Sequence, residues 1–208
     1  MRTFHLLLSL AIAAPGVAWA SPPSPANSTV PSCITLVGSS GGVAAAVGQF
    51  TVFVKDLANN PIAGAVVSVD LLSCPDLHFC AEQLDPAAVV DCANKRVNKA
   101  TDAAGSVTFT LLGGSNGAGN AVTLLNGGNV YENGTLIGRP TVSTFDLDGQ
   151  SGVGANDLAA WLTDFGTGNN LGRSDYDCNN CLGANDLSLW LTAFGSGTMT
   201  QSYGASCP

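Results

Sequence analysis

Hydrophobic and polar residues alternate with a period of two along residues 49–55, so Phe50, Val52 and Val54 would share one face. Such alternation is typical of a half-buried β-strand. Similar runs, separated by turns rich in Gly, Asn and Asp, predict further strands at residues 65–72, 106–112, 121–125, 130–137 and 141–145. Strands at this spacing, with almost no helical period between them, predict a mainly β fold built as an antiparallel sandwich.

The pattern changes after residue 145, where a segment is repeated. Residues 145–166, FDLDGQSGVGANDLAAWLTDFG, align with residues 174–195, SDYDCNNCLGANDLSLWLTAFG, at a period of 29 residues. Ten of the 13 positions that begin at Gly154 and at Gly183 are identical. Two copies of one unit are expected to bury their apolar sides against each other.

Aspartates recur at the same spacing in both copies, at positions 1, 3 and 12 of a twelve-residue loop. This spacing wraps oxygen ligands around Ca²⁺ at the start of a helix. Hard oxygen ligands suit Ca²⁺, whereas soft transition metals prefer nitrogen or sulfur. The sequence therefore predicts two calcium sites, with amide oxygens at position 5 and backbone carbonyls at position 7. The predicted ligands are Asp146, Asp148, Gln150, Gly152 and Asp157 in the first loop, and Asp175, Asp177, Asn179, Cys181 and Asp186 in the second.

The alternative is that these aspartates only shape turns before two amphipathic helices, since Asp is common in turns. The duplication of the whole spacing argues against it. Ser151 and Asn180 stand where a glycine is expected at position 6, and Ser tolerates a left-handed backbone less well than Asn. The first site is therefore expected to be weaker or distorted.

An apolar stripe at helical spacing follows each loop. The offsets of 3, 4 and 7 residues place each stripe on one helix face, where it would pack the copies together. Gly166 and Gly195 are expected to end the helices, and Val153 and Leu182, at position 8 of each loop, to pair in a short bridge. The stripes are Leu158, Trp161, Leu162 and Phe165, and then Leu187, Trp190, Leu191 and Phe194.

The N-terminus and the charge bear on location and partners. Residues 1–20 combine Arg2, an apolar run too short to span a bilayer and a small-x-small site ending at Ala20, which predicts a secretory signal peptide. No later stretch approaches the length of a membrane span, so we expect a secreted or cell-surface protein. Residues 21–32 are rich in Pro and Ser and predict a mobile lead-in. The net charge of −8 argues against nucleic acid as a ligand.

All seven cysteines lie beyond the predicted signal peptide, where oxidising conditions favour disulfides. The odd number leaves at least one unpaired, and spacing favours only two local pairs, Cys74 with Cys80 and Cys178 with Cys181. Zinc binding by Cys74, His78 and Cys80 is an alternative, but the paired Cys spacing of structural zinc sites is missing there. No nucleophile signature accompanies His78, so no enzymatic activity is predicted.

The segments FTVFVKDLANNPIAGAVVSVDLL and KATDAAGSVTFTLL resemble bacterial immunoglobulin-like modules of the invasin and intimin type. In those modules two strands flank a D-x-x-x-x-P-x-x-G turn, and a T-D-x-x-G turn opens a later strand. The resemblance covers residues 33–144 and implies an Ig-like β-sandwich that acts as a spacer or adhesive module. Residues 73–99 depart from this pattern by the inserted segment CPDLHFCAEQLDPAAVVDC.

The duplicated unit resembles a type I dockerin, a calcium module that docks into a cohesin on a scaffold protein. The resemblance implies a small α-helical dockerin-like domain with EF-hand-type loops over residues 145–208. Cohesin contacts in that family often use the two residues before the last loop carboxylate, which here are Ala155, Asn156, Ala184 and Asn185. The hydroxyl side chains common there are lacking. The cysteines of the second loop also resemble dockerin-like tails that anchor exported proteins of environmental bacteria.

These features together predict an exported, non-catalytic, calcium-binding protein. Its dockerin-like module would dock or anchor the Ig-like module in a surface or extracellular assembly, with a cohesin-like or other surface protein as partner. The alternative is an accessory component of an extracellular polysaccharide-degrading complex, which would add polysaccharide-degrading enzymes as partners.

Overall fold

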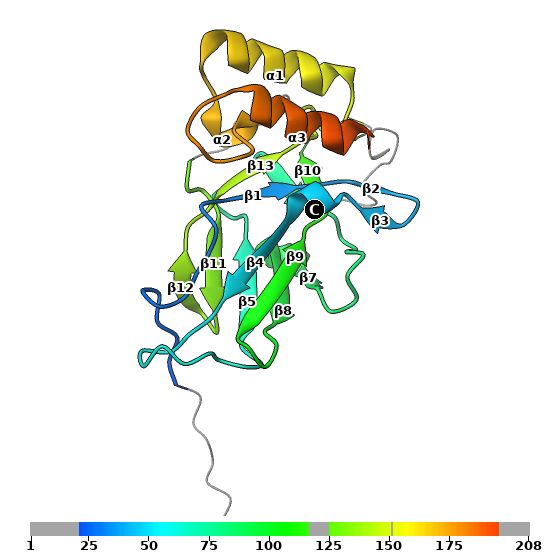
Figure 1. Cartoon of the computed structure of the whole chain (residues 1–208). Helices are drawn as coiled ribbons and strands as arrows, with labels where there is room; N and C mark the ends of the chain where they lie inside the picture. The colour runs from blue at the N-terminus through cyan, green and yellow to red at the C-terminus, as the bar shows by residue number, and fades with distance from the viewer. Residues whose placement is uncertain (1–20, 117–124, 151, 196–208) are drawn as a thin grey trace, which may run out of the picture.

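The computed structural model describes residues 21–116, 125–150 and 152–195. The predicted signal peptide, Ser151 and most of the strand predicted at residues 121–125 lie outside them. The described chain is mainly β, with a region of short strands and a smaller helical region at one end (Figure 1). The prediction of a β-rich chain with few helices is confirmed.

Five strands form the largest sheet, which is antiparallel throughout. The Val67, Val69 and Val97 side chains of its central strands are fully buried. The run predicted as one strand at residues 130–137 is a hairpin, because Asn133 and Gly134 both have positive φ (42° and 85°) and form a turn. The strand order is β12 (Thr135–Gly138), β11 (Asn129–Glu132), β5 (Val66–Asp70), β8 (Arg96–Ala100) and β7 (Val89–Asp91).

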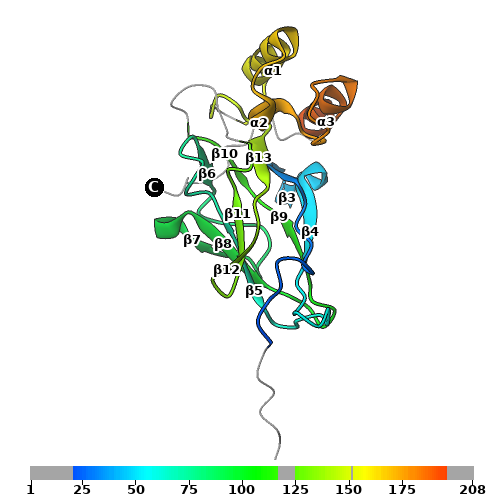
Figure 2. The same cartoon turned by 90° about the vertical axis from the view of Figure 1, so that its left-hand side faces the viewer.

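A second antiparallel pair joins β4 (Gln49–Phe53) to β9 (Ser106–Thr110). Val52 and Val107 are opposite each other and buried, whereas Phe53 is 42% exposed, so the predicted alternation is confirmed. Figure 2 shows this pair on one side of the β region and β7 and β8 on the other. Gly105, with φ of 70°, closes the turn before β9, and a Cβ there would lie 2.6 Å from the Val54 carbonyl oxygen.

The other strands form three two-stranded sheets. One of them is parallel, in contrast to the antiparallel pairing predicted for the whole region. A parallel pair needs a long connection, and the residues between positions 36 and 141 supply it. The pairs are β6 (Leu77–Phe79) with β10 (Gly113–Ser115), β2 (Ser39–Ser40) with β3 (Val43–Ala44), and the parallel pair β1 (Cys33–Leu36) with β13 (Thr141–Thr144).

Residues 73–99, which interrupt the Ig-like sequence pattern, are built into the fold. They supply β6, β7 and most of β8, and β8 lies between β5 and β7 in the largest sheet. Lys99 forms an ion pair with Asp85 and donates a hydrogen bond of 2.7 Å to the Thr108 carbonyl. The insertion is therefore a structural part of the β region.

Residues 21–32, predicted to be a mobile lead-in, are instead held along β4 and the residues that follow it. The Ser24 N–H donates to the Lys55 carbonyl at 2.8 Å. Thr29 and Phe53 exchange two backbone hydrogen bonds of 2.8 and 2.9 Å. Because this pairing depends on a strand that is distant in sequence, the local composition did not reveal it.

Three helices follow β13: α1 (Ala155–Thr167), α2 (Leu171–Ser174) and α3 (Ala184–Gly195). Helix α1 continues through Gly166, which was expected to end it, and ends at Gly168, whose φ is 68°. The Gly168 N–H donates to the Asp164 carbonyl at 2.7 Å, which is a left-handed helix C-cap. Helix α2 was not predicted, because four residues are too few to show a helical period.

The helical and β regions share one hydrophobic core. Phe145 directly follows β13, and the centroid of its ring lies 4.5 Å from that of the Tyr176 ring. The Tyr176 hydroxyl donates to the Thr144 carbonyl at 3.4 Å. A disulfide joins Cys33 of β1 to Cys178 in the helical region. The boundary predicted between residues 144 and 145 is therefore bridged by packed side chains and by a covalent bond.

Candidate metal centre

Two clusters of three aspartates lie before and at the start of α1 and α3, in the first loop (residues 146–157) and the second loop (residues 175–186). In each cluster one carboxylate oxygen from each of the three side chains lies within 4.8 Å of the other two. The fold therefore brings together the six carboxylates that the sequence predicts as ligands. The first cluster is Asp146, Asp148 and Asp157, and the second is Asp175, Asp177 and Asp186.

The aspartate at position 12 organises each loop. Asp157 accepts hydrogen bonds from the backbone N–H groups at positions 2, 3 and 9 of the first loop, at 2.6, 3.0 and 2.7 Å. Asp186 accepts bonds from the same three positions of the second loop, at 2.7, 3.2 and 2.9 Å. Both carboxylates lie in the first turn of a helix, where the helix dipole favours negative charge. The same wrapped loop is thus formed twice.

Burial makes these carboxylates electrostatically unusual. Asp148 and Asp177 are half-buried, but the other four are nearly excluded from water: Asp146 is 2% exposed, Asp157 1%, Asp175 5% and Asp186 0%. Burial, followed by the charges of the neighbouring Asp157 and Asp148, raises the pKa of Asp146 to about 7. Burial also raises the pKa of Asp157 and of Asp175. A cation placed among these oxygens would favour the ionised carboxylates and so oppose these shifts.

The other predicted ligands lie nearer the surface of the loops. Gln150 and Asn179, at position 5, are exposed, and the Asn179 amide donates to Asp177 Oδ2 at 2.9 Å. At position 7, Gly152 is buried and the Cys181 side chain is exposed. The prediction for position 7 concerns the backbone carbonyl, which is independent of the side chain.

Both loops have a left-handed backbone at position 4. The residue is Gly149 in the first loop, with φ of 68°, and Cys178 in the second, with φ of 60°. Asn180, at position 6 of the second loop, is also left-handed, with φ of 62°. Asn is one of the few non-glycine residues that adopt this conformation readily, as predicted for this position.

The cysteine pairing differs from the local pairs that spacing favoured. Cys178 is bonded to Cys33, with the two Cα atoms 6.0 Å apart, and Cys181 is free and exposed. Cys74 and Cys80 are both free and buried. The sequence missed the long-range pair because the pairing of β1 with β13, and not proximity in the chain, brings Cys33 to the second loop. Separately, residue 92 takes part in a disulfide.

The surroundings of Cys74, His78 and Cys80 do not support the zinc alternative. Within the ranges that the structure describes, the groups of three or more His, Cys, Asp or Glu side chains able to share a metal ion are the two aspartate clusters alone. Burial raises the pKa of Cys74 to about 11 and that of Cys80 to about 12. Burial, followed by the charge of Lys95, lowers the pKa of His78. Cys74 and Cys80 belong to the packed core around β6, and His78 is half-buried beside them.

A hydrogen-bonded ion pair that the sequence analysis missed links α1 to α2. Asp164 is 1% exposed and accepts two bonds from the Arg173 guanidinium, at 2.7 and 2.6 Å. Ser174 and Asn170 donate to the same carboxylate at 2.6 and 2.8 Å. Burial alone would raise the pKa of Asp164, but these hydrogen bonds hold it below its ordinary value. Ala193 stands at the equivalent position of the second copy. This difference between the copies is the sequence feature that could have singled out Asp164.

The two tryptophans at equivalent helix positions are buried, as the apolar stripes predict. Trp161 is 2% exposed and Trp190 is 1% exposed. The Trp161 Nε1–H donates to the Ser174 carbonyl at 3.1 Å, whereas Trp190 Nε1 has no hydrogen-bond partner among the described residues. Each indole ring stacks on the phenylalanine four positions later in its helix.

Apart from the tryptophans, each stripe combines half-buried and exposed side chains. That the stripes pack the two copies together stays a prediction. Helix α1 contacts α2, whereas α3 contacts the 3₁₀ turn η1 (Ala46–Gly48) of the β region. Leu162, Phe165 and Leu191 are 50%, 52% and 50% exposed. Val153 and Leu182 are buried, but no β-bridge joins them. A further 3₁₀ turn of the β region, η2, spans Cys92–Asn94.

The residues predicted to contact a partner are accessible. They occupy the first turns of α1 and α3. Both helices lie at the same end of the molecule (Figures 1 and 2). All four are exposed: Ala155, Asn156, Ala184 and Asn185.

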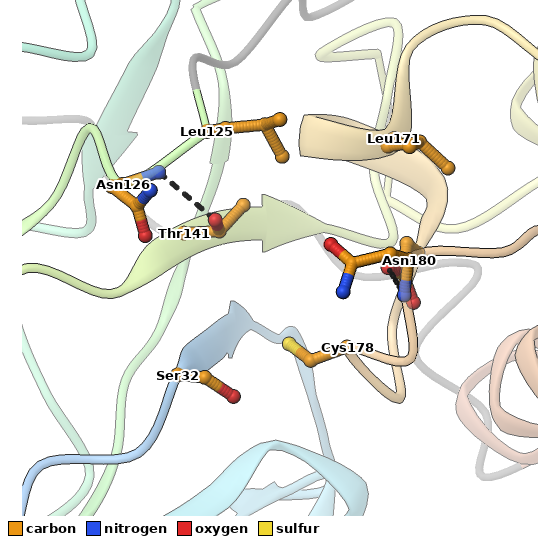
Figure 3. Close-up of a pocket in the computed structure, with 8 residues that line it drawn as sticks. Ser32, Leu125, Asn126, Thr141, Leu171, Cys178 and Asn180 are labelled. Carbon is orange, nitrogen blue, oxygen red and sulfur yellow. Dashed lines mark hydrogen bonds between the residues drawn. The ribbon is translucent and has the colours of Figure 1, made fainter.

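A cavity of about 240 Å³ lies between the second loop and the strands β1 and β13 (Figure 3). Asp175, Cys178 and Asn180 line it from the second loop. Thr141 lines it from the β region, as does Ser32, which precedes β1. The second loop thus faces the β region across this cavity. Cys178, which lines the cavity, is bonded to Cys33 of β1.

Comparison with protein-family models, with curated proteins and with solved structures finds no match. In the part of the chain that the structure describes, no helix is long and apolar enough to cross a membrane. The two aspartate clusters are therefore the feature of this molecule that points most directly to a function.

Proposed function

We propose that this is an exported Ca²⁺-binding protein, whose two loops each bind one ion. The observation that carries this proposal is the duplicated cluster of three carboxylates within 4.8 Å, at the same positions of two loops. Carboxylates are hard oxygen ligands, and a loop that supplies several of them before a helix suits Ca²⁺. Among the six carboxylates, those of Asp148 and Asp177 lie nearest to solvent, so an ion would enter past them.

Ca²⁺ binding would have a structural consequence. Each cluster places three carboxylates together, and burial opposes their ionisation. One Ca²⁺ per loop would neutralise two of three negative charges and stabilise the folded state through mass action. At a free Ca²⁺ concentration of 100 times Kd, the stabilisation is about 2.7 kcal/mol per site.

Isothermal titration calorimetry of the whole protein with CaCl₂ tests this proposal. We expect two ions per chain, and one ion in each of the single variants Asp148→Ala and Asp177→Ala. These two positions are half-buried, so their substitution disturbs packing less than that of the buried aspartates. The absence of Ca²⁺-binding heat, together with a melting temperature that a chelator leaves unchanged, would refute the proposal.

We further propose that the dockerin-like module docks or anchors an Ig-like module in an extracellular or cell-surface assembly. The supporting observations are the sequence resemblance and the exposure of the same Ala-Asn pair at the start of α1 and of α3. Identical pairs in both copies would let a cohesin-like partner bind in either of two orientations.

A pull-down from the secreted proteins of the source cells, with the tagged protein in Ca²⁺, tests the docking role. Asn156→Arg alone and Asn185→Arg alone are expected to retain a partner, because the other copy can still bind it. The double variant is expected to lose it. Equal capture by the double variant and the unmodified protein would contradict the proposed surface.

A further inference from the structure

The two loops share a left-handed backbone position but place different residues there. Position 4 is left-handed in both, but the first loop has Gly149 there and the second has Cys178. A glycine adopts this conformation without a steric penalty. A residue with a Cβ atom does not, because its Cβ approaches the following carbonyl oxygen. An additional interaction at Cys178 would offset this penalty.

The disulfide with Cys33 supplies that interaction. Cys33 begins β1, which is paired with β13, so its position is fixed by the β region. The loop residues around Cys178 have less support of this kind. Asn179, Asn180 and Cys181 are exposed, and the cavity lies between this part of the loop and the β region. Figure 3 shows the Cys178 sulfur directed toward the chain at the start of β1.

We propose that the Cys33–Cys178 disulfide sets the Ca²⁺ affinity of the second loop, which makes this site, and not the first, dependent on redox state. This inference rests on the proposed Ca²⁺ binding. With the disulfide closed, Cys178 stays left-handed and the carboxylates at positions 1 and 3, which directly precede it in the loop, keep their binding arrangement. With the disulfide open, nothing covalent holds Cys178 in the left-handed conformation. The loop must then adopt that conformation on binding Ca²⁺, and this lowers the Ca²⁺ affinity.

The opening step is an ordinary thiol–disulfide exchange with a dithiol reductant. Two electrons and two protons pass from the dithiol to the protein. The Sγ–Sγ bond between Cys33 and Cys178 breaks, both sulfurs become thiols, and the dithiol closes to its cyclic disulfide.

Calorimetry with CaCl₂ on the whole protein tests the proposal in an Asp148→Ala background, which leaves the second loop as the site measured. The variant C33S/C178S removes the disulfide and keeps a side chain at position 4. We expect its Ca²⁺ affinity to fall about tenfold, equivalent to about 1.4 kcal/mol. The variant C33S/C178G copies the first loop at position 4, and we expect it to recover affinity to within about threefold of the disulfide-bonded protein.

The first loop is the internal control. In an Asp177→Ala background, the affinity of the first loop is expected to change less than twofold between the disulfide-bonded protein and C33S/C178S. Full affinity of the second loop in C33S/C178S would overturn the proposal, as would failure of C33S/C178G to recover it. If the disulfide-bonded protein with both loops intact binds no Ca²⁺, the proposed function itself fails.

A measurement on the unmodified protein keeps the proposal testable if C33S/C178S does not fold. Coupling between two equilibria is reciprocal, so Ca²⁺ must make the disulfide harder to reduce by the same factor. A tenfold effect corresponds to a reduction potential about 30 mV more negative in Ca²⁺. Titration with a dithiol redox buffer, with trapped thiols at residues 33 and 178 quantified by mass spectrometry, measures this shift. An unchanged potential at saturating Ca²⁺ overturns the proposal.

Discussion

Removal of the Asp164 carboxylate is the most informative test of how the helical region is held together. In Asp164→Ala the Arg173 guanidinium, whose side chain is 7% exposed, loses its ionic partner while it remains buried. Ser174 and Asn170 lose an acceptor as well. Breaking a buried, hydrogen-bonded ion pair by removal of one partner costs about 3–5 kcal/mol. For a chain of 208 residues this corresponds to a fall in Tm of about 6–20 °C.

Urea unfolding followed by circular dichroism, at pH 7 in Ca²⁺, measures this loss. The matched control is Asp164→Ala combined with Arg173→Met, which removes the Arg173 charge as well. Replacement of a whole buried pair by apolar side chains is often nearly neutral, so the double variant should be more stable than Asp164→Ala alone. A loss below about 1 kcal/mol in the single variant, or a less stable double variant, would refute the reasoning.

The same pair gives a pH dependence with a definite sign. The folded-state pKa of Asp164 lies below its ordinary value of 3.8. Its contribution is therefore complete above the unfolded-state pKa and is lost as the pH falls through the folded-state pKa. The difference in unfolding free energy between the unmodified protein and Asp164→Ala should stay constant from pH 7 to pH 5 and shrink below pH 4. A difference that is constant down to pH 2 would show that the carboxylate is not stabilised by these bonds.

Three further substitutions probe the β region and the tryptophans. Glu132 is 1% exposed and burial raises its pKa, so ionisation of this side chain destabilises the folded state as the pH rises. Glu132→Gln should therefore gain about 1–3 kcal/mol at pH 7 and little at pH 4 in urea unfolding. Gly105→Ala should lower the free energy of unfolding by at least about 1 kcal/mol, because Gly105 has φ of 70° and a Cβ there would approach a carbonyl oxygen. The loss should be larger than in Gly134→Ala, where φ is 85° but a Cβ would meet open space. Equal losses in the two variants by calorimetry would contradict this. Trp161→Phe should cost about 0.5–1.5 kcal/mol more than Trp190→Phe, because only Trp161 Nε1–H has a hydrogen-bond partner; identical Tm values for the two variants would argue otherwise.

The binary pattern and the repeat were sufficient for the local features of this chain. Alternation identified β4 and the buried face of Val52, because a strand in a sheet exposes successive side chains to opposite sides. The spacing of Asp146, Asp148 and Asp157 predicted their cluster, since all three lie in one loop of twelve residues. The repeat then predicted the second cluster with the same geometry.

Features that depend on distant parts of the chain were decided by the tertiary structure. Cys33 and Cys178 are 145 residues apart, and only the parallel pairing of β1 with β13 brings them together. The packing of Tyr176 on Phe145 likewise turns two sequence modules into one continuous core. Local pattern reports the conformation that neighbouring residues prefer, whereas these contacts form because buried surfaces from separate segments fit each other. The sequence by itself therefore determined the two acidic loops, and the fold decided what holds the second of them in place.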